Sequence, residues 1–134
     1  MASMVRGAFC MKIEVHRAGS LGCRLWTMSP NDHDATLALT SHLPHLVASA
    51  LAGLLHPGLT GFAASGFRDT TRLASSDPAL WTSIFMQNAP RTIDAMTTLE
   101  HRFGEFRRAL QANDSAAIHR LLTEAKGIRD DLGS

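Results

Sequence analysis

Histidine and hydroxyl side chains gather between His33 and His45, a stretch that holds three histidines and Ser41. On a helix, His33, Ser41 and His45 fall within about a third of a turn, because steps of eight and four residues advance about 80° and 40°. His42 points elsewhere on such a helix. Imidazoles beside a hydroxyl suit a polar pocket that holds carboxylate or hydroxyl groups. We therefore interpret this face as one wall of a ligand site.

A second group of functional side chains lies in the word GFRDTTR and at Trp81. Arg68 and Arg72 are four residues apart and share a helix face, and Asp69 is adjacent to them. An arginine binds a carboxylate through two parallel hydrogen bonds, and a neighbouring aspartate holds its fork in place. Gly66 permits a close approach of the backbone. Together with the histidine stretch, these residues predict a site for a small, anionic, ring-shaped ligand.

Each group has a simpler or a rival reading. The three histidines form a zinc site in one alternative, although only Asp34 stands nearby as a conventional further ligand. In a second alternative, the two arginines and the aspartate of GFRDTTR form an ion pair on the helix surface, which contributes less than about 1 kcal/mol to stability. Trp81 is then an ordinary core residue.

The elements that position these residues are predicted to be helices. A cap at Ser29 or Asn31 opens a helical region, and the apolar run 35–55 continues it. Pro44 lies inside this run and predicts a kink, because proline removes a backbone hydrogen bond. Pro57-Gly58 stops the helix.

Three more helices are predicted beyond residue 76. Asp77-Pro78 opens a short one that ends near Gln87, and the apolar spacing of three and four predicts others over 90–110 and from about 115 to Leu132. We expect the last two to form an antiparallel pair. The fold class is therefore all-α, a domain of four to five helices over residues 29–134.

Residues 1–28 differ from the rest of the chain. They carry two stretches of weak strand character, 11–16 and 23–28, and both cysteines, Cys10 and Cys23. We expect this segment to be irregular, strand-like or disordered. The cysteine usage fits a reducing, cytoplasmic compartment.

Composition and missing motifs exclude several classes of protein. The chain has 134 residues and a net charge of +1, which argues against a nucleic-acid-binding protein. Its longest apolar runs are shorter than the roughly 20 residues of a membrane span. Neither a GxGxxG loop after a predicted strand nor a Walker A, GxSxG or CxxC motif occurs. The residues therefore offer no dinucleotide site, and we expect no bound metal.

These sequence motifs, in the order in which they occur along the chain, resemble those of a known family. Over about residues 22–132 the chain resembles the C-terminal helical domain of the prephenate/arogenate dehydrogenases of tyrosine biosynthesis. The resemblance rests on Met28-Ser-Pro, His33-Asp34, SHLPH at 41–45, GFRDTTRLA at 66–74, Ser76-Asp-Pro and Trp81 with Ile84-Phe85 and Asn88.

The resemblance assigns roles to individual residues. It implies that Arg72 binds a substrate carboxylate and that His45 also contacts tyrosine-like ligands. It further implies that the substrate pocket is lined by His33, Ser41, His45 and Gly66. Three neighbouring residues are implied to hold Arg72 in position without contacting the substrate: Asp69, Trp81 and Arg68.

The family's reaction implies what this chain does and lacks. Members transfer a hydride from prephenate or arogenate to NAD or NADP with loss of carbon dioxide, and their catalytic histidine belongs to a Rossmann domain. That domain is absent from these residues, and segment 1–28 is the expected remnant of its junction. We therefore expect this chain to contain no catalytic residue and to bind no cofactor alone. We also expect the isolated chain to be inactive. The expected partners are a second copy, a prephenate-, arogenate- or tyrosine-like molecule, and a separate Rossmann-domain chain.

Two other functions are alternatives. A free-standing helical dimer would bind an aromatic or prephenate-like acid without catalysis. A helical chorismate mutase ranks lower, because that chemistry needs several cations around a dicarboxylate and only Arg72 and Arg68 are available near the pocket.

Overall fold

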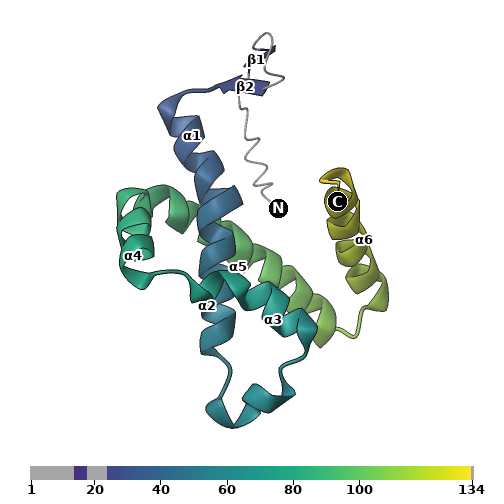
Figure 1. Ribbon diagram of the computed structural model, residues 1–134. Coiled ribbons are helices and arrows are strands. Elements are labelled where there is room, and N and C mark those ends of the chain that lie inside the picture. The colour runs from purple at the N-terminus through teal and green to yellow at the C-terminus, as the bar shows by residue number, and fades with distance from the viewer. Residues whose placement is uncertain (1–13, 18–23, 134) are drawn as a thin grey trace. The chain divides into compact units, whose positions relative to one another are not determined.

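The computed structural model describes residues 14–17 and 24–133 (Figure 1). The chain divides into two compact units, one up to Thr92 and one from Ile93, so the boundary falls inside helix α5. None of the helices in the described ranges is long and apolar enough to cross a membrane.

A short hairpin precedes the helices. Strands β1 (Glu14–Arg17) and β2 (Arg24–Thr27) pair antiparallel, with Glu14 opposite Thr27. Both fall in or beside the stretches with predicted strand character, and the strand-like prediction is confirmed there. The predictions for residues 1–13 and 18–23, including Cys10 and Cys23, lie outside the described residues.

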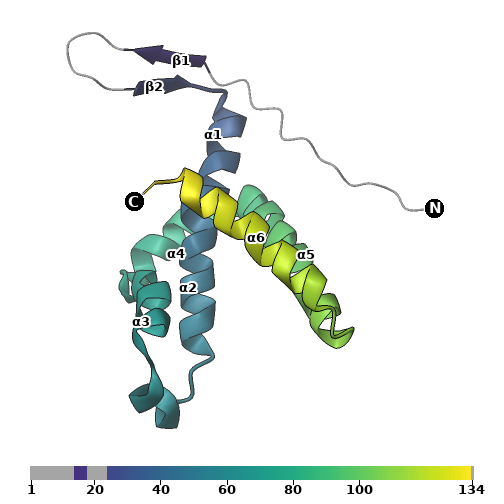
Figure 2. The ribbon, with the colours of Figure 1, turned by 90° about the vertical axis from the view of Figure 1, so that its right-hand side faces the viewer.

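One continuous helical column follows (Figures 1 and 2). It consists of α1 (Pro30–Leu37), the π-helical turn η1 (Ala38–His42) and α2 (Leu43–Gly53). Ser29 caps α1 as predicted, because its Oγ accepts a 3.1 Å hydrogen bond from the Asp32 amide.

The irregularity predicted at Pro44 takes the form of the π turn. The amide of Leu43 donates to the carbonyl of Ala38, five residues back. Thr40 also donates its hydroxyl to the carbonyl of Thr36 at 2.7 Å, a back-bond that tends to bend helices. A π turn relieves such local strain and frequently occurs at functional sites.

Three short helical segments and α4 complete the first unit. The 3-10 helix η2 (Pro57–Phe62), α3 (Ser65–Thr71) and the 3-10 helix η3 (Arg72–Ser75) come first, and α2 packs against α3 and η3. Helix α4 (Pro78–Gln87) begins and ends where the sequence predicts. Its cap is Asp77, whose Oδ1 accepts a 3.0 Å hydrogen bond from the Ala79 amide.

The second unit is an antiparallel helix pair. Helix α5 (Ala89–Gln111) leads through a tight turn into α6 (Ser115–Asp131), which Asp114 caps. Arg102 and Glu124 lie equally far from this turn and are joined by a 2.8 Å ion pair. The predicted antiparallel pair is therefore confirmed, as is the all-α fold class.

Candidate functional site

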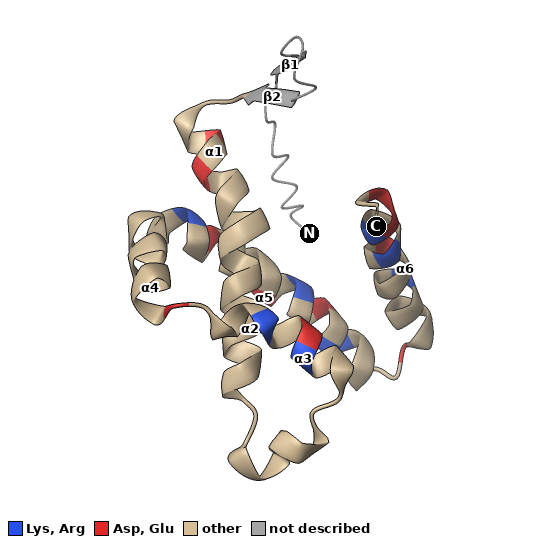
Figure 3. Cartoon of the chain, viewed as in Figure 1, with Lys and Arg blue, Asp and Glu red and all other residues tan. Residues whose placement is uncertain are grey.

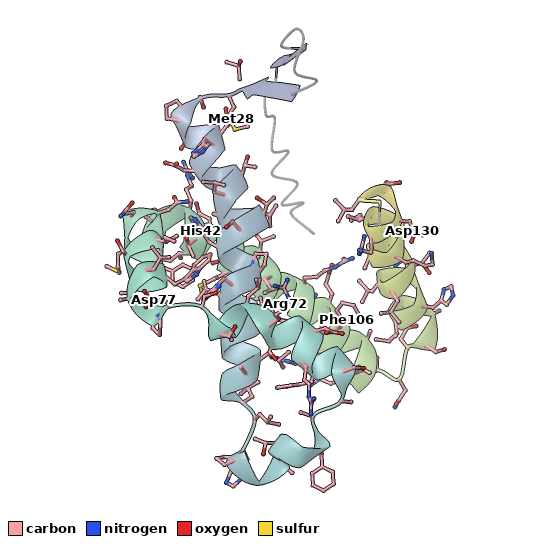
Figure 4. All side chains as sticks on the ribbon, viewed as in Figure 1. Met28, His42, Arg72, Asp77, Phe106 and Asp130 are labelled. Carbon is pink, nitrogen blue, oxygen red and sulfur yellow. The ribbon has the colours of Figure 1, made fainter. Side chains whose placement is uncertain are left out.

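Four rings meet between the helical column and α4, and we call them the ring cluster: His42, His45, Trp81 and Phe85. His45 stacks on Trp81 with ring centroids 3.6 Å apart and planes 10° apart. Phe85 lies 5.9 Å from the ring of His45 and 5.4 Å from that of Trp81. The edge contact between His42 and Phe85 spans 6.3 Å. Figure 4 labels His42 on the side of the column that faces α4.

Helical spacing explains why these rings meet. Trp81 and Phe85 are four residues apart on α4, and His42 and His45 are three apart, so each pair shares one helix face. Both histidines are buried, whereas Trp81 and Phe85 are half-buried. The cluster therefore combines a core contact with an accessible aromatic edge.

His45 carries an unsatisfied polar atom. Its Nδ1 is buried and has no hydrogen-bond partner. Burial lowers the pKa of His45, so the imidazole is neutral at pH 7. Leaving a buried polar atom without a partner costs about 1–3 kcal/mol, and native proteins contain few such atoms. A ligand that supplies a donor at this atom would remove the cost.

His42 is held by a polar network. Its Nδ1 lies 3.3 Å from Thr92 Oγ1 and 3.4 Å from Asn88 Nδ2. Asn88 Nδ2 also donates to the backbone carbonyl of Asp34 at 2.8 Å. Burial lowers the pKa of His42, and the negative charge of Asp34 opposes this in part. The network ties α1 to the junction of α4 and α5.

Sequence reasoning missed His42 as part of this group. It assigned His42 to a face away from His45, yet both contact Phe85. The spacing of three residues was the available signal, because such residues are neighbours on a helix. The structure also adds Asn88 and Thr92, whose positions follow from tertiary packing.

The other predicted pocket residues on the column lie outside the ring cluster. His33 is exposed, with its Nδ1 3.2 Å from Asp34 Oδ1. Ser41 is half-buried within η1. The π turn between His33 and His45 changes the rotation per residue, so the ideal-helix spacing that grouped them does not apply across it.

The GFRDTTR residues lie on α3 and η3, and their charged side chains are exposed. Arg72 begins η3, whose Ser75 hydroxyl donates to the Arg72 carbonyl at 2.9 Å. Within the described ranges neither Arg68 nor Arg72 forms an ion pair with Asp69. A side chain built at Gly66 would meet no atom within 4 Å. Figure 4 labels Arg72 beside α2 and α3, against which η3 packs.

Trp81, predicted to support Arg72, packs in the ring cluster. Trp81 stacks on His45, and among the described residues it forms no ring contact or hydrogen bond with Arg72. The structure therefore brings His45 and Trp81 together and leaves Arg72 free to meet a ligand from solvent.

The described residues do not suit a metal ion or a dinucleotide. Among residues 14–17 and 24–133, no three His, Cys, Asp or Glu side chains are arranged to hold a metal, so the zinc alternative has no ligand set there. The strands in these ranges form an antiparallel hairpin, whereas a dinucleotide site needs a parallel βαβ unit with a glycine-rich turn.

Comparison with known proteins assigns the family. Residues 29–124 match the family model described as prephenate dehydrogenase, dimerization domain. The chain belongs to this family. It is 36% identical over 111 residues to the prephenate dehydrogenase of Bacillus subtilis, covering 78% of this chain and 30% of that protein.

Solved structures agree with this assignment. The arogenate dehydrogenase of Synechocystis matches with a TM-score of 0.76 and 28% identity, over 83% of this chain and 43% of that one. The Aquifex aeolicus prephenate dehydrogenase in complex with hydroxyphenyl propionate and NAD+ matches with a TM-score of 0.68 and 31% identity, over 78% and 39%. The chain thus spans about a third of the length of the curated relatives it matches.

Proposed function

We propose that this chain is the substrate-binding and dimerisation part of a prephenate or arogenate dehydrogenase. The observation that carries the proposal is the stacked pair of His45 and Trp81, in which a buried imidazole nitrogen lacks a partner. A planar aromatic wall with one unsatisfied polar atom suits a cyclic ligand that bears a hydroxyl group. The family assignment supports the same class of ligand.

The proposed roles follow from charge and placement. Arg72 binds a ligand carboxylate, because it is exposed, unpaired within the described chain, and able to donate two parallel hydrogen bonds. His45, neutral through burial, meets the hydroxyl end of the ligand. His33, Ser41 and Gly66 line the approach, and Asp69, Arg68 and Trp81 act as positioning residues.

The hydride transfer itself needs groups that the described residues do not provide. We propose that a nucleotide-binding domain supplies NAD or NADP and the catalytic base. We also propose that the chain forms a homodimer and acts in the cytoplasm. The description of the matching family as a dimerization domain supports the homodimer.

A calorimetric titration with hydroxyphenyl propionate tests the binding role, since this molecule carries one phenol and one carboxylate. We expect saturable binding that Arg72→Ala weakens about 10- to 100-fold, because a charge-assisted hydrogen bond contributes about 1.5–3 kcal/mol. Lys126→Ala, which removes an exposed cation outside the proposed site, is the control and should bind nearly as the wild type. Equal losses in both variants, or no binding at all, would contradict the proposed site.

An assay with prephenate and NAD tests the division of labour. We expect the chain alone to produce no NADH. The appearance of NADH would show that these residues suffice for the oxidation and would overturn that part of the proposal.

A further inference from the structure

The donors and acceptors around His42 can be assigned one by one. Asn88 Nδ2 lies 2.8 Å from the backbone carbonyl of Asp34. Because a carbonyl only accepts hydrogen bonds, the amino group of Asn88, and not its amide oxygen, must face this carbonyl. The same amino group lies 3.4 Å from Nδ1 of His42 and has a second hydrogen to donate. Nδ1 of His42 is therefore placed to accept, with its lone pair toward Asn88.

Thr92 does not reverse this assignment. Its hydroxyl donates its one hydrogen to the backbone carbonyl of Asn88 at 2.8 Å. Its oxygen lies 3.3 Å from Nδ1 of His42 and then accepts only if Nδ1 carries a proton. Such a proton would turn the N–H groups of His42 and Asn88 toward each other. The other tautomer therefore gains a hydrogen bond to Thr92 but loses the one from Asn88 and adds a repulsion.

The surroundings of His42 keep its ring neutral. The ring is buried, and burial lowers the pKa of His42, an effect that the carboxylate of Asp34 opposes in part. The elements that carry the ring cluster, η1, α2 and α4, contain no Lys, Arg, Asp or Glu (Figure 3). A neutral imidazole holds one proton, on either of its nitrogens. The network around Nδ1 assigns this proton to Nε2.

Nε2 of His42 is the atom that remains available to a ligand. It forms no hydrogen bond with the described residues, whereas Nδ1 lies within the network. Among those residues, the fully buried side-chain nitrogen or oxygen atom without a partner is Nδ1 of His45 alone. Because Nε2 of His42 also lacks a partner, it is not fully buried. His42 thus presents an N–H donor at the accessible side of the ring cluster.

We propose that Asn88 is a positioning residue of the ligand site, which holds the proton of His42 on Nε2 so that this N–H donates a hydrogen bond to the hydroxyl oxygen of the ligand. His45 supplies the complementary group, because its unpartnered Nδ1 accepts from the same hydroxyl. Both histidine rings contact Phe85, which places them at one end of the ligand. A hydroxyl offers one hydrogen and two lone pairs, so one acceptor and one donor match it. This inference rests on the proposed function and adds the groups that recognise the ligand's hydroxyl.

Proton–nitrogen correlation spectra of the histidine side chains in the isotope-labelled full chain test the tautomer, because a protonated and a bare ring nitrogen resonate at different positions. We expect His42, identified by its absence from the spectrum of His42→Gln, to carry its proton on Nε2. Asn88→Asp places an acceptor beside Nδ1 and should move a proton to Nδ1, whereas Thr92→Val should leave the proton on Nε2. Gln87→Glu makes the same exchange of amide for carboxylate at the adjacent, exposed position and is the matched control, which should change nothing.

Calorimetric titration with two probes tests the ligand role. Hydroxyphenyl propionate and phenylpropionate differ by the hydroxyl group, so the ratio of their affinities measures how the site recognises it. The wild type should prefer the hydroxylated probe about 10-fold, and Asn88→Asp and His42→Gln should each reduce this preference to about 3-fold or less. Gln87→Glu should keep the wild-type preference. An equal loss of affinity for both probes in Asn88→Asp would show a structural role alone and overturn the inference.

The spectra and the titrations separate this inference from the proposed function. A proton on Nδ1 of His42 in the wild type would overturn the inference, and so would a wild-type preference for the hydroxylated probe in Asn88→Asp. Either result would leave the proposed function standing. Failure of the wild type to bind both probes would overturn the proposed function together with the ligand role of His42. If circular dichroism shows that Asn88→Asp does not fold, Asn88→Ser removes the donor without adding a charge and should reduce the preference equally.

Discussion

Phe85 and Phe103 both belong to amphipathic helices, yet their surroundings differ. Phe85 contacts three other rings of the first unit. Phe103, in the second unit, is 54% exposed and lies in a stripe of similarly exposed side chains. The ring cluster is therefore satisfied largely by its own chain, whereas the α5–α6 pair presents an apolar face outward. The spacing of apolar residues predicts an apolar face on both helices, but it does not indicate which residues pack against that face.

Removing the largest ring should have the largest effect on the first unit. We expect Trp81→Ala to lower the free energy of unfolding by about 2–4 kcal/mol, because it removes the stacked partner of His45 and leaves a cavity beside Phe85. Chemical denaturation measures this change. Met86→Ala on the same helix, at a side chain 72% exposed, should stay within about 0.5 kcal/mol of the wild type. Similar effects of the two substitutions would contradict a packed ring cluster.

The buried histidines make the first unit sensitive to pH. Because burial lowers the pKa of His42 and of His45, the unfolded chain takes up their protons at a higher pH than the folded chain. Their contribution to stability is thus present above about pH 6.5 and is lost as the pH falls below that value. Denaturation midpoints between pH 7 and pH 5 measure the slope.

A substitution at one buried histidine should reduce that slope. We expect His45→Gln to lose part of the decline seen in the wild type, while His33→Gln, at an exposed position, keeps the wild-type slope. An unchanged slope in His45→Gln would show that its imidazole does not titrate as the burial implies.

The smallest effect is expected in the second unit. Arg102 bridges Glu105 and Glu124, each at 2.8 Å, but the three side chains are 37–49% exposed. We expect Arg102→Gln to lower the free energy of unfolding by about 0.2–1 kcal/mol, as for exposed ion pairs, with less effect in high salt. A loss as large as that of Trp81→Ala would mean that this bridge, and not apolar packing, holds the helix pair together.

Local signals predicted the helix boundaries well. Ser29 and the Asp77-Pro78 pair act through hydrogen bonds within a few residues, so the sequence places α1 and α4 accurately. Apolar spacing likewise gave the helix pair at the C-terminus. The π turn at 38–42 was outside this reach, because it depends on a proline and on competing threonine back-bonds acting together.

The site was predicted only in part, because its contacts depend on how distant segments of the chain pack together. His45 and Trp81 were both identified, but their stacking depends on how α4 packs against the column. His42, Asn88 and Thr92 come from segments more than 40 residues apart and meet only in the folded chain. The exposed position of Arg72 follows from the short 3-10 helix that it begins, which no residue spacing indicated.

The proposed ligand site can be tested most directly through Trp81 itself. The chain has two tryptophans, so a Trp26→Phe variant leaves Trp81 as the only indole reporter. Titrating this variant with hydroxyphenyl propionate should change its fluorescence with the same saturation curve that calorimetry gives, because the ligand occupies the wall formed by His45 and Trp81. Saturable heat without any change in Trp81 fluorescence would place the ligand elsewhere and contradict the account.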